Sequence, residues 1–295
     1  MQTRERSPCF LVPFLAAVIA AFAAPRAAAQ LVLPKASPAA KVSLEVGPAK
    51  VEIAYARPAR RGRDVRAELA AAGAVWRLGA NEATTITLDE AASIGGQRLP
   101  AGKYALFARV GADGGDGPWT LLFNRTAQQW GSYFHDPKQD ALRVELKPRR
   151  LATAREWFTI GLDPKDDDSA TVTIAWDTVE LAFDLDFDVA ALVERNLARA
   201  VAELAPKDWD TRLQIVKHWV GRGERLADAL RLAEAAVAIE ANFWTLEWNA
   251  RALHALQDVE AAIPLLERAI EAAKVGPPPE YRAGLERLLA AWQAE

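Results

Sequence analysis

The chain has 295 residues, which is enough for about two domains of ordinary size. Hydrophobic residues make up 51% and charged residues 25%, which is typical of a globular protein. The formal net charge of -3 excludes a global positive field, so we expect no nucleic-acid partner and no recruitment to an acidic membrane surface.

The first 29 residues are predicted to be a secretory signal peptide. Two arginines precede an apolar run over residues 10–24, and three alanines at residues 27–29 before Gln30 fit a small-residue cleavage site. The alternative is a membrane anchor, but the run is shorter than the ~20 apolar residues of a spanning helix, and Pro13 interrupts it. We therefore expect an exported protein, periplasmic or extracellular, with no membrane span after cleavage.

The only cysteine of the chain, Cys9, lies inside this predicted signal. The mature chain would then have no disulfide, no cysteine nucleophile and no cysteine-based metal site. Export without disulfides indicates a bacterial envelope protein whose core is large enough to fold without cross-links.

Residues 41–188 follow a period of two, which is typical of β-strands. Apolar and polar side chains alternate over residues 42–46 and 51–55, and Gly47-Pro48 between them predicts a β-hairpin. No βαβ alternation is present, which argues against a doubly wound nucleotide fold. We expect an antiparallel β-sandwich or open barrel over residues 30–188. The further predicted strands cover residues 84–88, 103–109, 119–123, 142–146, 157–162, 171–176 and 179–185.

From Asp188 onward the apolar period changes to three and four, which predicts helices with Asp188 as the first N-cap. Two segments, residues 229–237 and 262–270, align at an offset of 33 residues with alanines at the packing positions. This repeat resembles the tetratricopeptide pattern, in which each helical hairpin covers the apolar face of its neighbour. The predicted helices cover residues 189–204, 210–220, 225–240, 244–256, 259–273 and 281–292.

The expected fold class is therefore α+β in two domains, with a tetratricopeptide-like α-helical hairpin repeat over residues 189–295. An ordinary helical bundle is the alternative, because the consensus residues of the repeat are poorly kept and Pro264 falls within the fifth helix. A repeat of this kind is expected to bind a protein partner.

An arginine-rich loop follows the second predicted strand. Five arginines lie between Arg57 and Arg66, and Pro58 and Gly62 shape the loop. Guanidinium groups presented this way can bind carboxylate or phosphate. The alternative is a solvated loop whose arginines pair with the acids of the same domain. Arg57 and Arg63 are the residues that we single out as ligand-binding.

The densest group of aromatic, charged and small residues covers residues 75–84. Trp76 offers an aromatic wall beside Arg77, Asn81 offers a donor and an acceptor, and Glu82 can accept from an arginine or act as a general base. The structural alternative is that Trp76 fills the core and that Glu82 pairs with Arg57 or Arg63 and joins the two loops.

A third polar and aromatic segment covers residues 124–136. Trp130 and His135 are its candidate ligand-binding residues, and His135 is the only histidine of the predicted β domain. A lone loop histidine is more often simply exposed. Ser132 lacks the Gly-x-Ser-x-Gly context of a hydrolase nucleophile.

No metal site and no cofactor are expected. The sequence contains no His-Glu-x-x-His motif and no clustered histidines. The aspartates at residues 163–168 lack the spaced ligands and the glycine of a calcium loop, so they are expected to form a solvated turn.

Four motifs in order resemble one known family. They are Tyr55-x-Arg57-Pro58 with Gly62-Arg63, the run from Trp76 to Thr84, Gly95-x-x-x-Leu99-x-Ala101-Gly102-x-Tyr104, and Trp130-Gly131. Over residues 37–185 the chain is similar to the domain of unknown function 2911. The resemblance implies secretion and a β-rich domain. It implies no reaction, so no catalytic residue is carried over.

Three functions remain open. The first is a non-enzymatic envelope protein that binds a polar or glycan-like ligand between the loops and a protein through its helices. The second is a hydrolase or isomerase that uses Glu82 as acid or base, with Asp64 or Asp136 as a possible second carboxylate. The third is a purely structural interaction protein.

Overall fold

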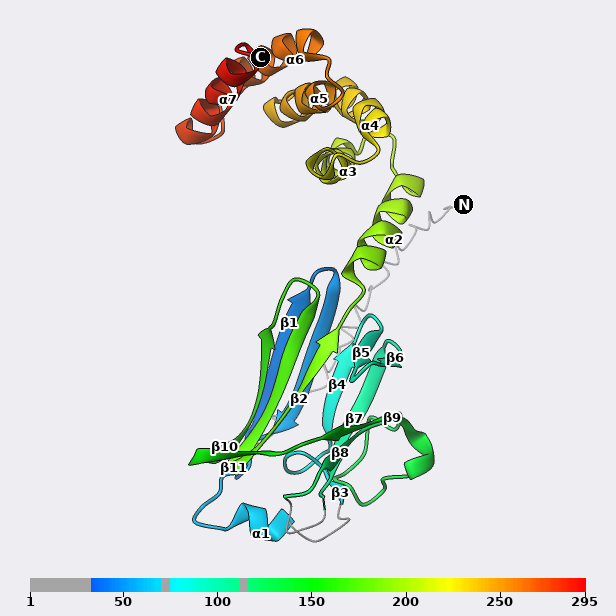
Figure 1. Cartoon of the computed structure of the whole chain (residues 1–295), viewed down its shortest axis with the longest axis vertical. Coiled ribbons are helices and arrows are strands. Elements are labelled where there is room, and N and C mark those ends of the chain that lie inside the picture. The colour runs from blue at the N-terminus through cyan, green and yellow to red at the C-terminus, as the bar shows by residue number, and fades with distance from the viewer. Residues whose placement is uncertain (1–32, 70–74, 112–115) are drawn as a thin grey trace, which may run out of the picture. The chain divides into compact units, whose positions relative to one another are not determined.

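The computed structural model describes residues 33–69, 75–111 and 116–295, so the predicted signal peptide lies outside the described residues. The strands and helices named below all belong to one compact unit, residues 36–295. Antiparallel β-sheets come first and six helices follow (Figure 1). The predicted α+β class is confirmed.

The first sheet has seven strands in the order β1-β2-β4-β7-β8-β9, and β3 pairs with β7 off this path. The predicted hairpin at Gly47-Pro48 is confirmed, because β1 and β2 pair from Ala39↔Ala56 to Val46↔Ala49. The strands of this sheet are β1 Ala39–Val46, β2 Ala49–Ala56, β3 Val75–Trp76, β4 Thr84–Leu88, β7 Gly102–Arg109, β8 Trp119–Asn124 and β9 Asp140–Leu146.

The second sheet has the order β10-β11-β5-β6. Its members are β10 Arg149–Pro164, β11 Ser169–Asp186, β5 Ala92–Ile94 and β6 Gln97–Leu99. The short hairpin of β5 and β6 surrounds Gly95-Gly96, which the sequence marks as a turn but not as part of a hairpin.

Strand β11 reverses direction at Asp177, whose φ is 53°. The amide of Phe187 donates to the carbonyl of Asp168 at 2.9 Å. The hydroxyl of Thr171 donates to the carboxylate of Asp184 at 2.7 Å. A straight strand would separate these two side chains by about 43 Å. The predicted strands at residues 171–176 and 179–185 are therefore the two arms of β11.

The core lies between the two sheets. Strand β2 alternates buried and more exposed residues, as a period of two requires. Its buried side chains join those of the second sheet, such as Ile174 and Leu181, in one hydrophobic cluster. Phe123 of β8 meets Phe183 of β11 edge-to-face at 5.9 Å between ring centroids. Two antiparallel sheets that share one core form a β-sandwich.

All six predicted helices are confirmed, and the predicted cap is correct, because Asp188 accepts from the amide of Ala191 at 3.0 Å. The fifth of them continues through Pro264. A short helix in the β region, α1 Val65–Leu69, was not predicted. The others are α2 Val189–Ala202, α3 Trp209–Arg222, α4 Leu226–Ile239, α5 Phe243–Ala255, α6 Val259–Ala272 and α7 Pro279–Trp292.

Each helix from α3 to α7 contacts the next one along the chain, and α3 also contacts α5. The alanines of the 33-residue offset are fully buried at these contacts, with Ala229 and Ala236 in α4 and Ala262 and Ala269 in α6. Small side chains let neighbouring helices approach closely. The identity of the repeat as tetratricopeptide-like stays a prediction.

Candidate functional site

Residues 75–84 form a compact turn between two strands of the first sheet. β3 pairs Trp76 with Ala108 of β7, and β4 begins at Thr84. The hydroxyl of Thr84 donates to the carbonyl of Leu78, and its amide donates to the carbonyl of Arg77 at 3.3 Å. These bonds close the turn on itself and hold it at the end of β2.

Gly79 permits this close approach. A Cβ added to Gly79 would lie 2.8 Å from the carbonyl oxygen of Ala56, and the φ of Gly79 is 143°. Only glycine adopts such a backbone readily. The turn therefore lies directly against the end of β2, where the arginine-rich loop begins.

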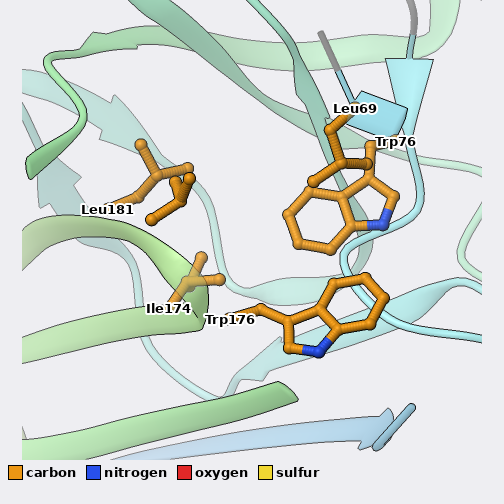
Figure 2. A pocket seen from close by; sticks show the side chains of 6 residues that line it. Leu69, Trp76, Ile174, Trp176 and Leu181 are labelled. Carbon is orange, nitrogen blue, oxygen red and sulfur yellow. The ribbon is translucent and has the colours of Figure 1, made fainter. Parts of the chain in front are cut away.

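Trp76 lies beside Trp176 and near the apolar side chains of Leu69 and Ile174 (Figure 2). Its ring stacks on Trp176 at 6.0 Å and meets Phe158 and Trp119 edge-to-face at 5.4 Å and 6.3 Å. The adjoining enclosed cavity has a volume of about 10 Å³ and apolar lining residues. This space is too small for a ligand, and Trp76 packs against the core as a partly buried side chain.

The arginine-rich loop is held by internal contacts. Arg57 donates from Nε to the carbonyl of Phe158 and from Nη2 to the hydroxyl of Thr159, both at 3.0 Å. These bonds join the end of β2 in the first sheet to β10 in the second. Arg57 also lines an open hollow together with Pro38 and Trp157.

Arg60 and Arg63 are engaged in the same way. Arg60 lies 3.3 Å from the buried carboxylate of Asp177, and Arg63 pairs with Glu68 at 3.0 Å and lies 5.5 Å from the Trp176 ring. The structure thus corresponds to the alternative in which these arginines pair with acids of their own domain.

Glu82 is exposed, and its backbone pairs with that of Trp130. Within the part of the chain that the structure describes, its carboxylate has neither an ion pair nor a side-chain hydrogen bond. The expected pairing of Glu82 with Arg57 or Arg63 is wrong, because both guanidinium groups are used elsewhere. A glutamate that serves as general acid or base is usually buried, whereas Glu82 is exposed.

An exposed aromatic surface adjoins Glu82. Trp130, Tyr133 and Phe134 follow β8, and their exposed fractions are 54%, 74% and 72%. We call these three residues the aromatic loop. Arg77 fixes one end of it, because its Nη1 donates to the carbonyl of Asn81 at 2.9 Å while its guanidinium carbon lies 5.5 Å from the Tyr133 ring.

Gly131 makes this contact possible. Its φ is 62°, and a Cβ added to it would lie 2.8 Å from Nη1 of Arg77. A side chain at this position would displace the end of the Arg77 side chain, and its backbone would be strained at this positive φ. Asn81 contacts a further segment, since its amide nitrogen lies 3.5 Å from the carbonyl oxygen of Ser37.

His135 lies beneath the aromatic loop. Its side chain is only 5% exposed, its Nε2 lies 2.9 Å from the carboxylate of Asp140, and its ring meets Phe107 edge-to-face at 5.1 Å. Asp140 also accepts from Asn124 and from Arg143, each at 2.9 Å. The expectation of a simply exposed histidine is wrong. His135 is a buried member of a polar network that supports the loop.

The structure brings together four of the candidate residues, because Arg77 donates to the carbonyl of Asn81 and the backbone of Glu82 pairs with that of Trp130. Arg57, Arg63 and Trp76 lie at the contact between the sheets. Sequence reasoning missed Asp140 as the partner of His135, and it gave Tyr133 and Phe134 no role. The density of aromatics at residues 130–134 was the available signal.

A group that could hold a metal ion lies in the helical part of the described residues, not in the β part. It consists of Glu194, His218 and Glu224. Among the described residues, no helix is long and apolar enough to cross a membrane.

A family model described as a protein of unknown function (DUF2911) matches residues 37–185, which covers the whole sandwich from β1 to β11 except its final residue. No curated protein and no solved structure matches the chain.

Proposed function

We propose a function for this chain, which belongs to the DUF2911 family of proteins of unknown function. It is an exported binding protein of the bacterial envelope, and its β-sandwich binds a glycan-like ligand. The observation that carries the proposal is the aromatic loop, where Trp130, Tyr133 and Phe134 are all more than half exposed. Large apolar side chains gathered on a surface are typical of interaction sites.

The chemistry of the loop favours a sugar over a purely apolar ligand. Trp and Tyr present flat apolar faces that stack on the C–H faces of sugar rings, and each carries a polar group that can hydrogen-bond. Arg77, Asn81 and Glu82 border the loop and offer donors and acceptors to hydroxyl groups. The guanidinium carbon of Arg77 lies 5.5 Å from the Tyr133 ring, and a contact that orders this side chain before binding reduces the entropy lost on binding.

Titration calorimetry with a panel of neutral and uronic-acid hexasaccharides tests the proposal. We expect Trp130→Ala and Tyr133→Ala each to weaken, at least about tenfold, the binding of any hexasaccharide that the unchanged chain binds. Loss of an interface anchor has an effect of this size. Trp244→Ala is the matched control, because Trp244 is a 42% exposed tryptophan on α5. The proposal fails if no member binds more tightly than about 1 mM, or if Trp130→Ala binds as the unchanged chain does.

We further propose that helices α3–α7 form a tetratricopeptide-like repeat that binds a protein partner. The fully buried alanines and the contacts between successive helices support this assignment. Trp244 stacks on Trp209 at 6.4 Å between ring centroids and remains exposed. It is the residue that we expect to contact the partner.

Photo-crosslinking from position 241, an exposed alanine just before α5, checks this second proposal in chains that keep or replace Trp244. A partner recovered with the unchanged chain should be lost with Trp244→Ala and kept with Trp130→Ala. Loss with both variants, or with neither, contradicts an interface on α5.

Export is proposed from the sequence, since the predicted signal lies outside the described residues. Cell fractionation with N-terminal sequencing of the mature protein should recover a chain that begins at Gln30 from the periplasm or the medium. Recovery of the uncleaved chain from the cytoplasm contradicts export.

A further inference from the structure

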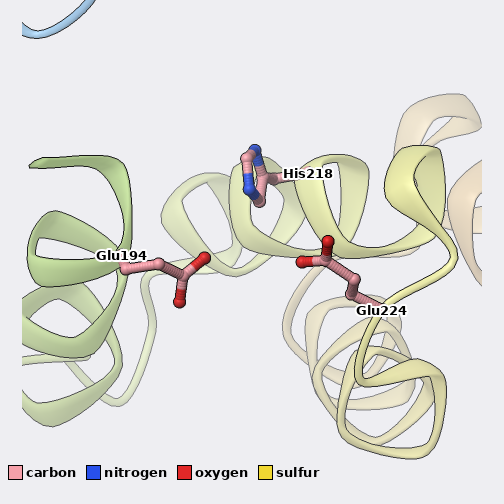
Figure 3. Close-up of side chains that lie close together, drawn as sticks. All are labelled: Glu194, His218 and Glu224. Atoms are coloured by element: carbon pink, nitrogen blue, oxygen red, sulfur yellow. The ribbon is translucent and has the colours of Figure 1, made fainter. Parts of the chain in front are cut away.

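We propose that Glu194, His218 and Glu224 form a zinc-binding site at the junction of α2 with α3. This inference is independent of the aromatic loop. One oxygen from each glutamate and one ring nitrogen of the histidine all lie within 4.8 Å of one another (Figure 3). No ion pair joins these three residues to one another among the described residues.

The three residues reach this position from separate elements. Glu194 lies on α2 and His218 on α3, and Glu224 follows the left-handed C-cap Gly223 of α3. The amide of Glu224 donates to the carbonyl of Trp219 at 2.9 Å, which fixes the turn. An apolar cluster joins α2 to α3, because Leu197 and Val201 of α2 and Leu204 just after it pack with Ile215, Trp219 and Ala229.

His218 provides a second, independent indication of a bound ligand. Its Nε2 is buried and has no hydrogen-bond partner among the described residues. Nearly all buried polar atoms in native proteins have a partner, so an orphan at this position calls for an explanation. A metal ion bound to the imidazole would explain the unpartnered nitrogen. It would also explain why two carboxylates lie close to it.

The charges around the group are partly balanced. Arg222 pairs with Glu224 at 2.9 Å from its Nε to Oε1, which leaves the second oxygen of Glu224 available. For Glu194, no ion pair is found among the described residues. A divalent cation would offset the repulsion between the two carboxylates that Arg222 alone does not remove.

The mixed donor set fits zinc. Imidazole nitrogen suits zinc as well as copper, iron and nickel, and zinc also accepts carboxylate oxygen. Zinc binds at about 2.0–2.2 Å from such donors, so tetrahedral ligand atoms stand about 3.4 Å apart. The ligand atoms lie within 4.8 Å of one another and both glutamates are exposed, so their side chains have room to rotate toward that spacing.

Three protein ligands leave one position of a tetrahedral zinc ion open. His218 also lines an open cavity between α2 and α3, together with Asn196 and Gln214. A water molecule or a small ligand can therefore reach the fourth position. The ion would also cross-link α2 to the turn that follows α3.

Zinc titration calorimetry of the untagged, chelator-stripped full chain tests the site. We expect one zinc ion per chain, and Glu194→Gln and His218→Gln should each weaken binding at least about tenfold. Glu234→Gln on α4 and His254→Gln on α5 are the matched controls and should bind as the unchanged chain does. Cobalt(II) should give a tetrahedral absorption band that Glu194→Gln abolishes.

The proposal is overturned if the unchanged chain binds no zinc, if His218→Gln binds it unchanged, or if Glu234→Gln weakens binding as much as Glu194→Gln. Circular dichroism without metal shows whether each variant is folded. Should His218→Gln not fold, Glu194→Gln decides the question, because Glu194 is exposed and its side chain is not part of the apolar cluster.

Discussion

Trp76 and Trp130 are both tryptophans of the motifs that define the family resemblance, yet they have opposite surroundings. Trp76 is enclosed by Trp119, Phe158 and Trp176 between the sheets. Trp130 is 54% exposed on the aromatic loop. The same residue type thus serves packing at one position and is available for binding at the other.

Replacing these two residues by alanine should separate stability from binding. We expect Trp76→Ala to lower the free energy of unfolding by about 3 kcal/mol, because the aromatic cluster loses its central ring. Trp130→Ala should change it by less than about 1 kcal/mol, as exposed substitutions do. Urea denaturation measures both values. Equal losses for the two variants would contradict the assignment of Trp76 to the core.

His135 shows why a residue type alone does not define a role. Its side chain lies between Asp140 and Phe107, and Asp140 is held in turn by Asn124 and Arg143. A buried carboxylate with several donors is a stable support for a loop. His135 is therefore buried next to the aromatic loop and supports it, and its side chain is not part of the exposed aromatic surface.

At the scale of the elements, buried polar contacts join helices that are distant in the sequence. Glu247 of α5 is buried, and it accepts from Arg251 at 2.8 Å and from the hydroxyl of Tyr281 on α7. Burial, and then the bond to Glu247, raise the pKa of Tyr281 above its ordinary value. The neutral hydroxyl is thus the form that the folded protein favours.

Tyr281→Phe should lower the free energy of unfolding by about 1–2 kcal/mol, because one donor to a buried carboxylate is lost. Since folding raises the pKa of Tyr281, the stabilisation by its hydroxyl is fully present below the unfolded pKa of about 10. It declines as the pH rises through the raised pKa of the folded state. Tyr133→Phe is the matched control and should have no effect, since Tyr133 is exposed. Thermal denaturation at pH 7 compares the two.

Strand β11 offers a test at acidic pH. Asp184 accepts from Lys165 at 2.6 Å and from Thr171 at 2.7 Å, and these contacts, Lys165 first, hold the pKa of Asp184 below its ordinary value. A carboxyl group whose pKa is lowered by folding stabilises the fold at pH values above its unfolded pKa of about 3.9. That stabilisation is lost as the pH falls through the lowered pKa of the folded state.

Asp184→Asn should therefore lower the melting temperature at pH 6 and have a smaller effect near pH 2.5. The difference at pH 6 should correspond to less than about 1 kcal/mol, because the Asp184–Lys165 pair is partly exposed and screened by solvent. Thermal scans of both proteins at the two pH values provide the measurement. A difference that grows as the pH falls would contradict the assigned direction.

At the scale of the whole chain, α2 is part of the sandwich as well as the first of the six helices. Leu192 belongs to the sandwich core, and Val189 packs against it. A Cβ added to Gly47 in the β1–β2 turn would lie 2.7 Å from Val189. Arg195 of α2 also pairs with Glu90 at 2.5 Å. The start of α2 is therefore tied to the β part, while its later turns pack on α3.

Leu192→Ala should accordingly speed amide hydrogen exchange in the β1–β2 hairpin and in α2, and leave α5–α7 unchanged. The expected loss is about 2–3 kcal/mol of local stability, since a buried leucine is truncated. Leu256→Ala, at an exposed position after α5, is the control. Faster exchange in α5–α7 with Leu192→Ala would mean that the sandwich and these helices unfold together.

The sequence by itself determined the order and type of most elements, because hydrophobic periodicity and turn residues are local properties. The alternation over residues 42–46 and 51–55 predicted the first hairpin, and the change of period at Asp188 predicted the six helices. The short strands β3, β5 and β6 escaped notice, since two or three residues carry no measurable period.

Only the tertiary structure decided how the candidate residues are used, because ion pairs and burial depend on residues far apart in the chain. Arg57 bonds to Phe158 and Thr159, about a hundred positions away, and this removed the predicted pair with Glu82. The convergence of Glu194 with His218 and Glu224 is of the same kind. No spacing rule links these residues, since the packing of α2 on α3 brings them together.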